Sequence, residues 1–83
     1  MINSFVEMVE EKIEEGNLLT IGMVYGKFNI MDSIVPDFIS VDSNIHIKGE
    51  WMDMIIPANC EIIYDEFEEE YVFKYNSMTL YFS

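Results

Sequence analysis

Carboxylates are the only chemically active side chains that this sequence holds in number. Sixteen Asp and Glu stand against four Lys, one His and one Cys, and the formal net charge is −12. General acid–base catalysis needs two carboxyl groups held in a cleft with pKa values that are pushed apart. Here the acids occur in runs, such as Glu10-Glu11 and Glu68-Glu69-Glu70, which are typical of solvated surfaces. We therefore expect no catalytic carboxylate pair.

Metal and nucleophile chemistry is limited by the single histidine, His46, and the single cysteine, Cys60. Tetrahedral zinc sites draw on several such ligands. The acidic run at 65–70 lacks the alternating ligands, the central glycine and the closing bidentate glutamate of an EF-hand loop. Cys60 has no basic neighbour in the sequence that would lower its pKa. The sequence thus predicts no metal, no cofactor and no enzymatic activity.

The carboxylates are concentrated in two stretches of the chain, and we predict that both bind a partner. In the first stretch the glutamates recur at i,i+4 spacing, which is unfavourable by roughly 0.2–0.5 kcal/mol for each like-charged pair on a helix. Two of them would also lie at the negative end of the helix dipole. Charges placed against local stability indicate a functional surface. The predicted binding residues are Glu7, Glu10, Glu11, Glu14 and Glu15 in the first stretch and Glu61, Asp65, Glu66, Glu68, Glu69 and Glu70 in the second.

A helix at 2–15 must carry the first stretch. Apolar residues recur there at helical spacing: Ile2, Phe5, Val6, Val9 and Ile13. Ser4 followed by Glu7 fits a capping box at its start. Gly16-Asn17 supplies a stop signal at its end. The pattern predicts an amphipathic helix with one apolar face.

Strands should follow, because the chain turns to β-branched and aromatic residues interrupted by turn signals. The predicted strands are 18–28, 38–41, 44–51, 54–56 and 60–65, followed by a C-terminal hairpin. Gly22 and Gly26 weaken the first strand or mark a bulge, and 29–36 is expected to be a connection. In the hairpin across Asp42-Ser43, four apolar residues should share the inner face: Ile39, Val41, Ile45 and Ile47.

The C-terminal hairpin has the clearest register. A two-residue turn at Asn76-Ser77 puts three residue pairs on one apolar face: Tyr75 with Met78, Phe73 with Leu80, and Tyr71 with Phe82. Tyr81 falls on the other face, and we add it to the predicted partner-binding residues. The fold expected is α+β, with the N-terminal helix packed on an antiparallel sheet of five to seven short strands. Residues 1–83 should form a single domain.

Charge and cysteine content restrict the compartment and the partners. A lone cysteine forms no intrachain disulfide, and the N-terminus has no basic region or apolar run of a signal peptide, so we expect a cytoplasmic protein. With −12 charge and no arginine, direct binding of nucleic acid or of an anionic membrane is excluded. A basic protein, such as a nucleic-acid-binding protein or a nuclease, is the partner that the electrostatics favour.

The function expected is inhibition of such a partner, with carboxylates standing in for phosphates at its nucleic-acid-binding site. In size, charge and lack of an active site the chain is similar to phage-encoded anti-CRISPR and anti-restriction proteins, although no motif identifies a family. Two alternatives stay open: an immunity protein or antitoxin against a basic toxin, and a structural subunit that forms a homo-oligomer through a strand edge. Solubility alone is a competing explanation of the acidity.

Overall fold

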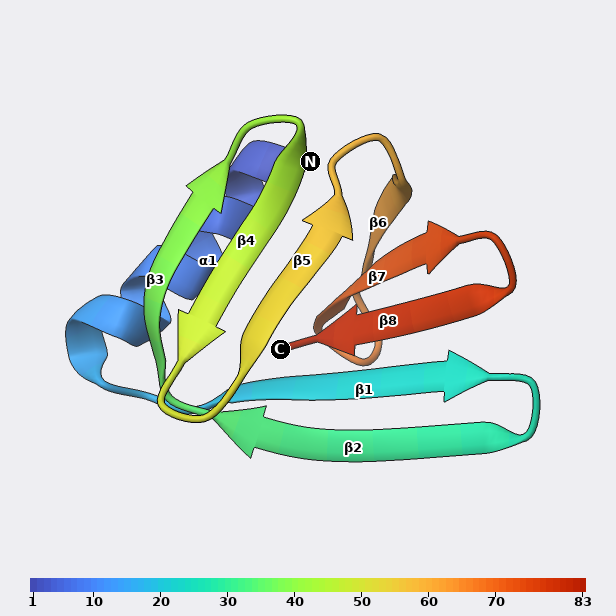
Figure 1. The fold of residues 1–83 in the computed structure, drawn as a ribbon, viewed down its shortest axis with the longest axis horizontal. Helices are drawn as coiled ribbons and strands as arrows, with labels where there is room; N and C mark the ends of the chain where they lie inside the picture. Colours follow the sequence, from blue (N-terminus) through green and yellow to red (C-terminus); the bar gives the residue numbers. More distant parts are fainter.

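A computed structural model describes residues 1–83 as one helix followed by eight strands (Figure 1). The elements are α1 (Ile2–Glu15), β1 (Leu19–Tyr25), β2 (Phe28–Ile34), β3 (Pro36–Val41), β4 (Asn44–Gly49), β5 (Asp53–Pro57), β6 (Glu61–Asp65), β7 (Glu70–Tyr75) and β8 (Met78–Phe82). The predicted α+β class is confirmed. The prediction of one sheet is wrong, because the strands form a five-stranded sheet in the order β2-β1-β8-β7-β6 and a three-stranded sheet in the order β3-β4-β5.

The two sheets separate at the junction of β2 and β3. Only Val35 lies between the strands, and β3 begins with a buried proline, Pro36, which has no N–H to continue a ladder. The sheets approach closely here: a Cβ added at Gly49 of β4 would lie 3.0 Å from Ile34 Cδ1 and 3.2 Å from the Val35 carbonyl oxygen. The proline break and this crossing explain why one continuous sheet does not form.

The helix has the predicted bounds, but its N-terminal cap differs from the predicted one. At its end Gly16 adopts the left-handed conformation, with φ 67°, and the Asn17 N–H donates to the Lys12 carbonyl at 2.9 Å. At its start the N-cap is Met1, and no side chain caps the helix. The predicted capping box is therefore wrong, since Ser4 lies inside the first turn.

The first hairpin corrects two predictions. The expected strand 18–28 reverses at Gly26-Lys27, and the expected connection 29–36 contains strand β2. Gly26 has φ 60°, as a type II′ hairpin turn requires at its first central position. Gly22 marks no bulge, because β1 and β2 pair in one unbroken register from Leu19↔Ile34 to Tyr25↔Phe28.

The two hairpins whose registers the sequence predicted, β3–β4 and β7–β8, follow those registers. In β3–β4, Ile39 lies opposite Ile47 and Val41 opposite Ile45. In β7–β8 the pairs are Tyr71↔Phe82, Phe73↔Leu80 and Tyr75↔Met78. These hairpins are local, so alternation and turn chemistry are sufficient to set them.

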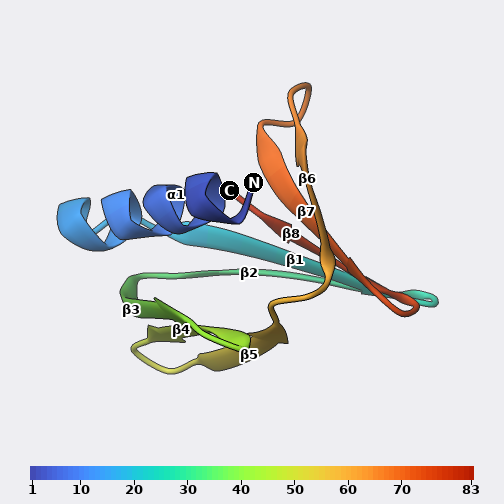
Figure 2. The ribbon, with the colours of Figure 1, turned by 90° about the horizontal axis from the view of Figure 1, so that it is seen from above.

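Phe5 of α1 joins the helix to the large sheet. It is fully buried, and its ring makes edge contacts with Phe73 at 4.7 Å, Phe82 at 5.1 Å and Tyr71 at 5.6 Å between centroids. The same core includes Ile45, Ile47 and Ile56 of the small sheet, so one apolar cluster holds all three layers together. Figure 2 shows α1 above and the small sheet below. In the same view β6 is steeply inclined relative to β1 and β2, because the large sheet is strongly twisted. The single helix has fourteen residues and is too short and too polar to cross a membrane.

Candidate acidic interface

The five glutamates of α1, here called the helix cluster (Glu7, Glu10, Glu11, Glu14, Glu15), are exposed on the side of the helix opposite its buried residues. Because an α-helix has 3.6 residues per turn, the positions from 7 to 15 that are not used by the core fall on one broad solvent-facing arc. Phe5 and Val9, both fully buried, fix that orientation. Because the apolar face of α1 packs on the sheet, the glutamates on the opposite side of the helix face the solvent.

A groove of about 490 Å³ separates α1 from the turn between β6 and β7. Met8 and Lys12 line it from the helix, and Glu69 lines it from the turn. Its base includes Tyr64 and Tyr71, whose rings lie 4.8 Å apart. The residues Asp65, Glu66, Glu68, Glu69 and Glu70 form the turn cluster. The turn cluster thus lines this groove through Glu69, whereas the helix lines it with Met8 and Lys12 and not with the glutamates of the helix cluster.

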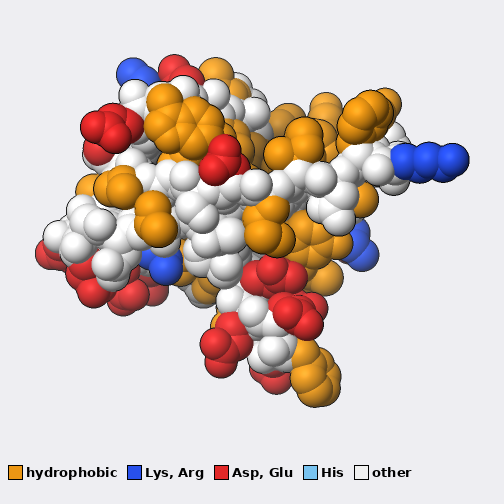
Figure 3. Space-filling model, turned by 90° about the horizontal axis from the view of Figure 1, so that it is seen from below, with side chains coloured by type: hydrophobic (Ala, Val, Ile, Leu, Met, Phe, Trp, Pro, Cys, Tyr) orange, Lys and Arg blue, Asp and Glu red, His pale blue; other side chains and the backbone are white.

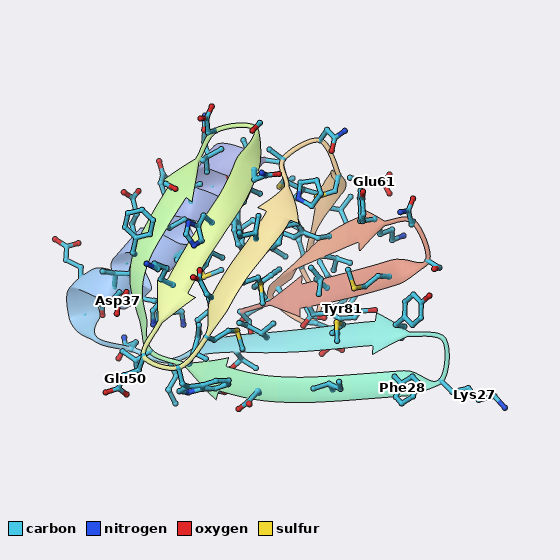
Figure 4. The ribbon with its side chains drawn as sticks, viewed as in Figure 1. Lys27, Phe28, Asp37, Glu50, Glu61 and Tyr81 are labelled. Carbon is cyan, nitrogen blue, oxygen red and sulfur yellow. The ribbon has the colours of Figure 1, made fainter.

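In Figure 3, α1 and the projecting β6–β7 turn lie along the lower edge of the view, and acidic side chains gather on both. The lysine at the tip of the β1–β2 hairpin extends from the far end (Figure 4). Acidic groups dominate at α1 and the β6–β7 turn.

A second groove, of about 560 Å³, lies on the other side of α1, against β3. Glu10 and Glu14 line it from the helix, and Asp37 lines it from the strand. Asp37, labelled in Figure 4, is a residue that sequence reasoning missed. Its position in the sequence gave no signal, because it stands alone after Pro36 and joins the helix cluster only through the packing of β3 against α1.

The β6–β7 turn is stabilised by hydrogen bonds between its backbone N–H groups and the Asp65 side chain. Asp65 Oδ1 accepts hydrogen bonds from the N–H of Phe67 at 3.0 Å and of Glu68 at 3.2 Å. Glu69 follows in the left-handed conformation, with φ 54°. The turn presents Phe67, which is 99% exposed, among the carboxylates. Sequence reasoning also missed Phe67, although a lone aromatic inside an acidic run was a usable signal.

One carboxyl group of the turn cluster has a raised pKa. The pKa of Glu70 is raised, first because its carboxyl is partly desolvated and then because the charges of Glu68 and Asp65 oppose its ionisation. The pKa of Tyr71 is also raised, by desolvation first, then by Tyr64 and more weakly by Glu7, against a hydrogen bond from Ser4 that lowers it. Glu7 of the helix therefore lies within electrostatic reach of the groove base.

Two predicted binding residues lie apart from this surface. Glu61 points from β6, where it is paired in register with Lys74 (Figure 4). Tyr81 lies on the outer face of the large sheet, half-buried between Gly22 and Val72, its partners in the flanking strands. The structure does not bring either residue to the groove between α1 and the β6–β7 turn.

His46 and Cys60 lie in different parts of the fold, in β4 and directly before β6. His46 Nε2 is hydrogen-bonded to Asp53 Oδ1 across β4 and β5. Cys60 is half-buried before β6, and desolvation raises the pKa of its thiol. No three or more His, Cys, Asp or Glu side chains gather in a way that could hold a metal ion.

Comparison with known proteins finds no matching family model, no matching curated protein and no matching solved structure. Functional inference therefore depends on the geometry of this surface alone.

Proposed function

We propose that this chain is a non-enzymatic cytoplasmic protein that binds a basic protein partner through its acidic face. The observation that supports the proposal is that the five glutamates of the helix cluster are exposed on one face of α1, while the turn cluster, through Glu69, lines the groove beside the same helix. The raised pKa of Glu70 adds to it, since carboxylates crowded against one another are stabilised when cationic groups approach.

A nucleic-acid-binding protein is the partner class that fits this face best. Lysine and arginine in a nucleic-acid channel are spaced to meet a row of phosphates. The helix cluster offers carboxylates on successive helical turns, about 5.4 Å apart along the axis. We infer that these carboxylates occupy the channel in place of phosphates and block it. An inhibitor of a host defence nuclease, of the anti-CRISPR or anti-restriction type encoded by phages, would act in this way.

Phe67 gives the proposed contact a non-electrostatic component. An exposed aromatic ring among charged residues is a typical interface anchor, because it buries a large apolar area at a small cost in conformational entropy. The hydrogen bonds from the backbone to Asp65 hold the turn in place before binding. Charge would steer the encounter, and the ring would slow dissociation.

Affinity capture from the native host, followed by mass spectrometry, tests the proposal with two matched baits. The Glu14→Lys/Glu15→Lys variant reverses two charges of the helix cluster, and the Asp42→Lys/Glu50→Lys variant reverses two exposed charges away from it. We expect the wild type and the second variant to recover a nucleic-acid-binding protein that duplex DNA displaces, and the first variant to lose it. Equal capture by all three baits, or no displacement by DNA, would contradict the proposal.

A further inference from the structure

The two sheets leave four edge strands, β2, β3, β5 and β6, and three of them carry protection against pairing with another chain. β3 begins at Pro36 and has a register irregularity directly after it. β5 runs from Asp53 to Pro57, and β6 is bounded by Glu61 and Asp65. Proline, bulges and charges are the usual means by which natural edges avoid pairing.

β2 has almost none of this protection. It is seven residues long, contains no proline and pairs with β1 without any irregularity. Its single charge is Asp32. Apolar side chains are exposed on both of its faces: Phe28 is 71% exposed and Ile30 52% on one face, and Met31 is 75% exposed on the other. A long apolar edge of this kind is a template for another strand.

The outward backbone groups of β2 can be identified from the hairpin. In a two-residue hairpin the residues that flank the turn, here Tyr25 and Phe28, face each other as a hydrogen-bonded pair. By alternation, the N–H groups of Asn29, Met31 and Ser33 point away from β1. The Ser33 N–H accordingly donates to Asp32 Oδ1 at 2.8 Å. The open part of the edge is therefore centred on Asn29 and Met31.

Local charge identifies a second copy of this chain as the occupant. The net charge of −12 would drive two copies apart at most surfaces, but the β2 segment contains one cation, Lys27, and one anion, Asp32. In an antiparallel pair the Lys27 end of each strand meets the Asp32 end of the other, so the segment complements itself. The turn cluster adjoins β6, at the opposite edge of the same sheet, and is therefore kept far from the contact.

We propose that β2 pairs antiparallel with β2 of a second copy and joins two five-stranded sheets into one. The contact is isologous, so it closes at two copies and does not propagate into a fibre. Asn29 and Met31 supply the new ladder, and Phe28 and Ile30 gain apolar cover (Figure 4 labels Lys27 and Phe28 at the hairpin end). This pairing does not depend on the proposed function, although it would give the assembly two acidic faces.

Analytical ultracentrifugation tests this pairing with a matched pair of variants. Met31 and Ile63 stand at the two ends of one cross-strand row, Met31–Gly22–Tyr81–Val72–Ile63, at opposite edges of the sheet. We expect the wild type and Ile63→Lys to sediment at twice the 9.8 kDa chain mass at high concentration, and Met31→Lys to sediment as a single chain. Added salt should strengthen the dimer, because it screens repulsion between the copies.

Hydrogen exchange on the wild type gives a second measurement that needs no folded variant. The amides of Asn29 and Met31 should become protected as concentration rises, whereas other exposed edge amides should not change. A wild type that stays a single chain at every soluble concentration overturns the pairing, as does a dimer that Met31→Lys leaves intact. A single chain that captures a different protein through β2, and loses it in Met31→Lys, overturns the second copy in favour of a foreign strand.

Discussion

Tyr81 packs over Gly22 on the outer face of the large sheet, where a Cβ added at position 22 would lie 3.5 Å from Tyr81 Cβ. That distance is ordinary van der Waals contact, so a methyl group fits without displacing the ring. Gly22 also has no positive φ. We expect Gly22→Ala to raise the free energy of unfolding by about 0.4–1 kcal/mol, because alanine restricts the unfolded chain. Thermal denaturation followed by circular dichroism measures this change.

Gly16→Ala is the matched control, and its effect should have the opposite sign. A Cβ added at position 16 would meet no atom within 4 Å, but the φ of Gly16 is 67°. A left-handed conformation costs a non-glycine residue roughly 1–2 kcal/mol. Destabilisation by both substitutions would show that position 22 needs glycine for a reason other than conformational freedom.

The contacts of Phe5 predict a second outcome. Phe5→Ala removes a fully buried ring that touches three other aromatic rings. Such a truncation costs about 3–5 kcal/mol, which is comparable to the whole stability of a domain of this size. We expect the variant to lose its cooperative thermal transition and its near-ultraviolet circular dichroism.

Phe67→Ala makes the same chemical change at a ring that is 99% exposed. Its free energy of unfolding should stay within about 0.5 kcal/mol of the wild-type value. Capture of the proposed basic partner should nevertheless fall, because the anchor is removed. Unchanged capture would exclude Phe67 from the interface, and a large loss of stability would show that the ring packs against the protein.

The sequence predicted the local hairpins but not the way they assemble. Tyr71 and Phe82 could be paired in advance, because alternation and a two-residue turn define a single register. The β1–β2 turn was missed, since Gly22 and Gly26 both read as interruptions, and Asn29, Asp32 and Ser33 read as a connection. Local sequence patterns do not reveal that these residues belong to an exposed edge strand, where polar side chains are tolerated.

The candidate site was predictable in the same partial way. Runs of acid marked both clusters, but the position of α1 beside the β6–β7 turn depends on Phe5, which docks α1 against β7 and β8. Phe67 was missed because an aromatic residue is ordinarily expected in the core. Asp37 reaches the helix only through the proline junction that separates the sheets. Each of these placements is a tertiary effect.

The raised pKa of Glu70 gives a third prediction, on the pH dependence of stability. Because the folded-state pKa lies above the ordinary value of 4.5, ionisation of Glu70 opposes folding. Its stabilising contribution is fully present below pH 4.5 and is lost as pH rises through the folded-state value. We expect Glu70→Gln to be more stable than the wild type at neutral pH, with the difference shrinking as pH falls towards 4.5.

Glu50→Gln removes one charge far from the turn cluster and serves as the control for Glu70→Gln. Urea denaturation across this pH range compares the three proteins. A stability gain in Glu70→Gln that does not change with pH would show that the ionisation of Glu70, which desolvation and then Glu68 and Asp65 oppose, is not its cause.

The helix cluster gives the last prediction, which separates binding from stability. Glu14→Lys/Glu15→Lys converts the i,i+4 pairs Glu10/Glu14 and Glu11/Glu15 from repulsive to attractive in the favourable order. It also places cations at the C-terminal end of α1, where the helix dipole favours them. The two converted pairs alone supply about 1 kcal/mol and the dipole adds to it, so Tm should rise by at least roughly 4 °C. The same variant should lose the partner. Asp42→Lys/Glu50→Lys, which changes the net charge equally, should keep it. A stabilised variant that no longer binds would show that selection holds the helix cluster against the stability of its own helix. If Tm falls instead, other contacts of Glu14 and Glu15 outweigh these helix terms.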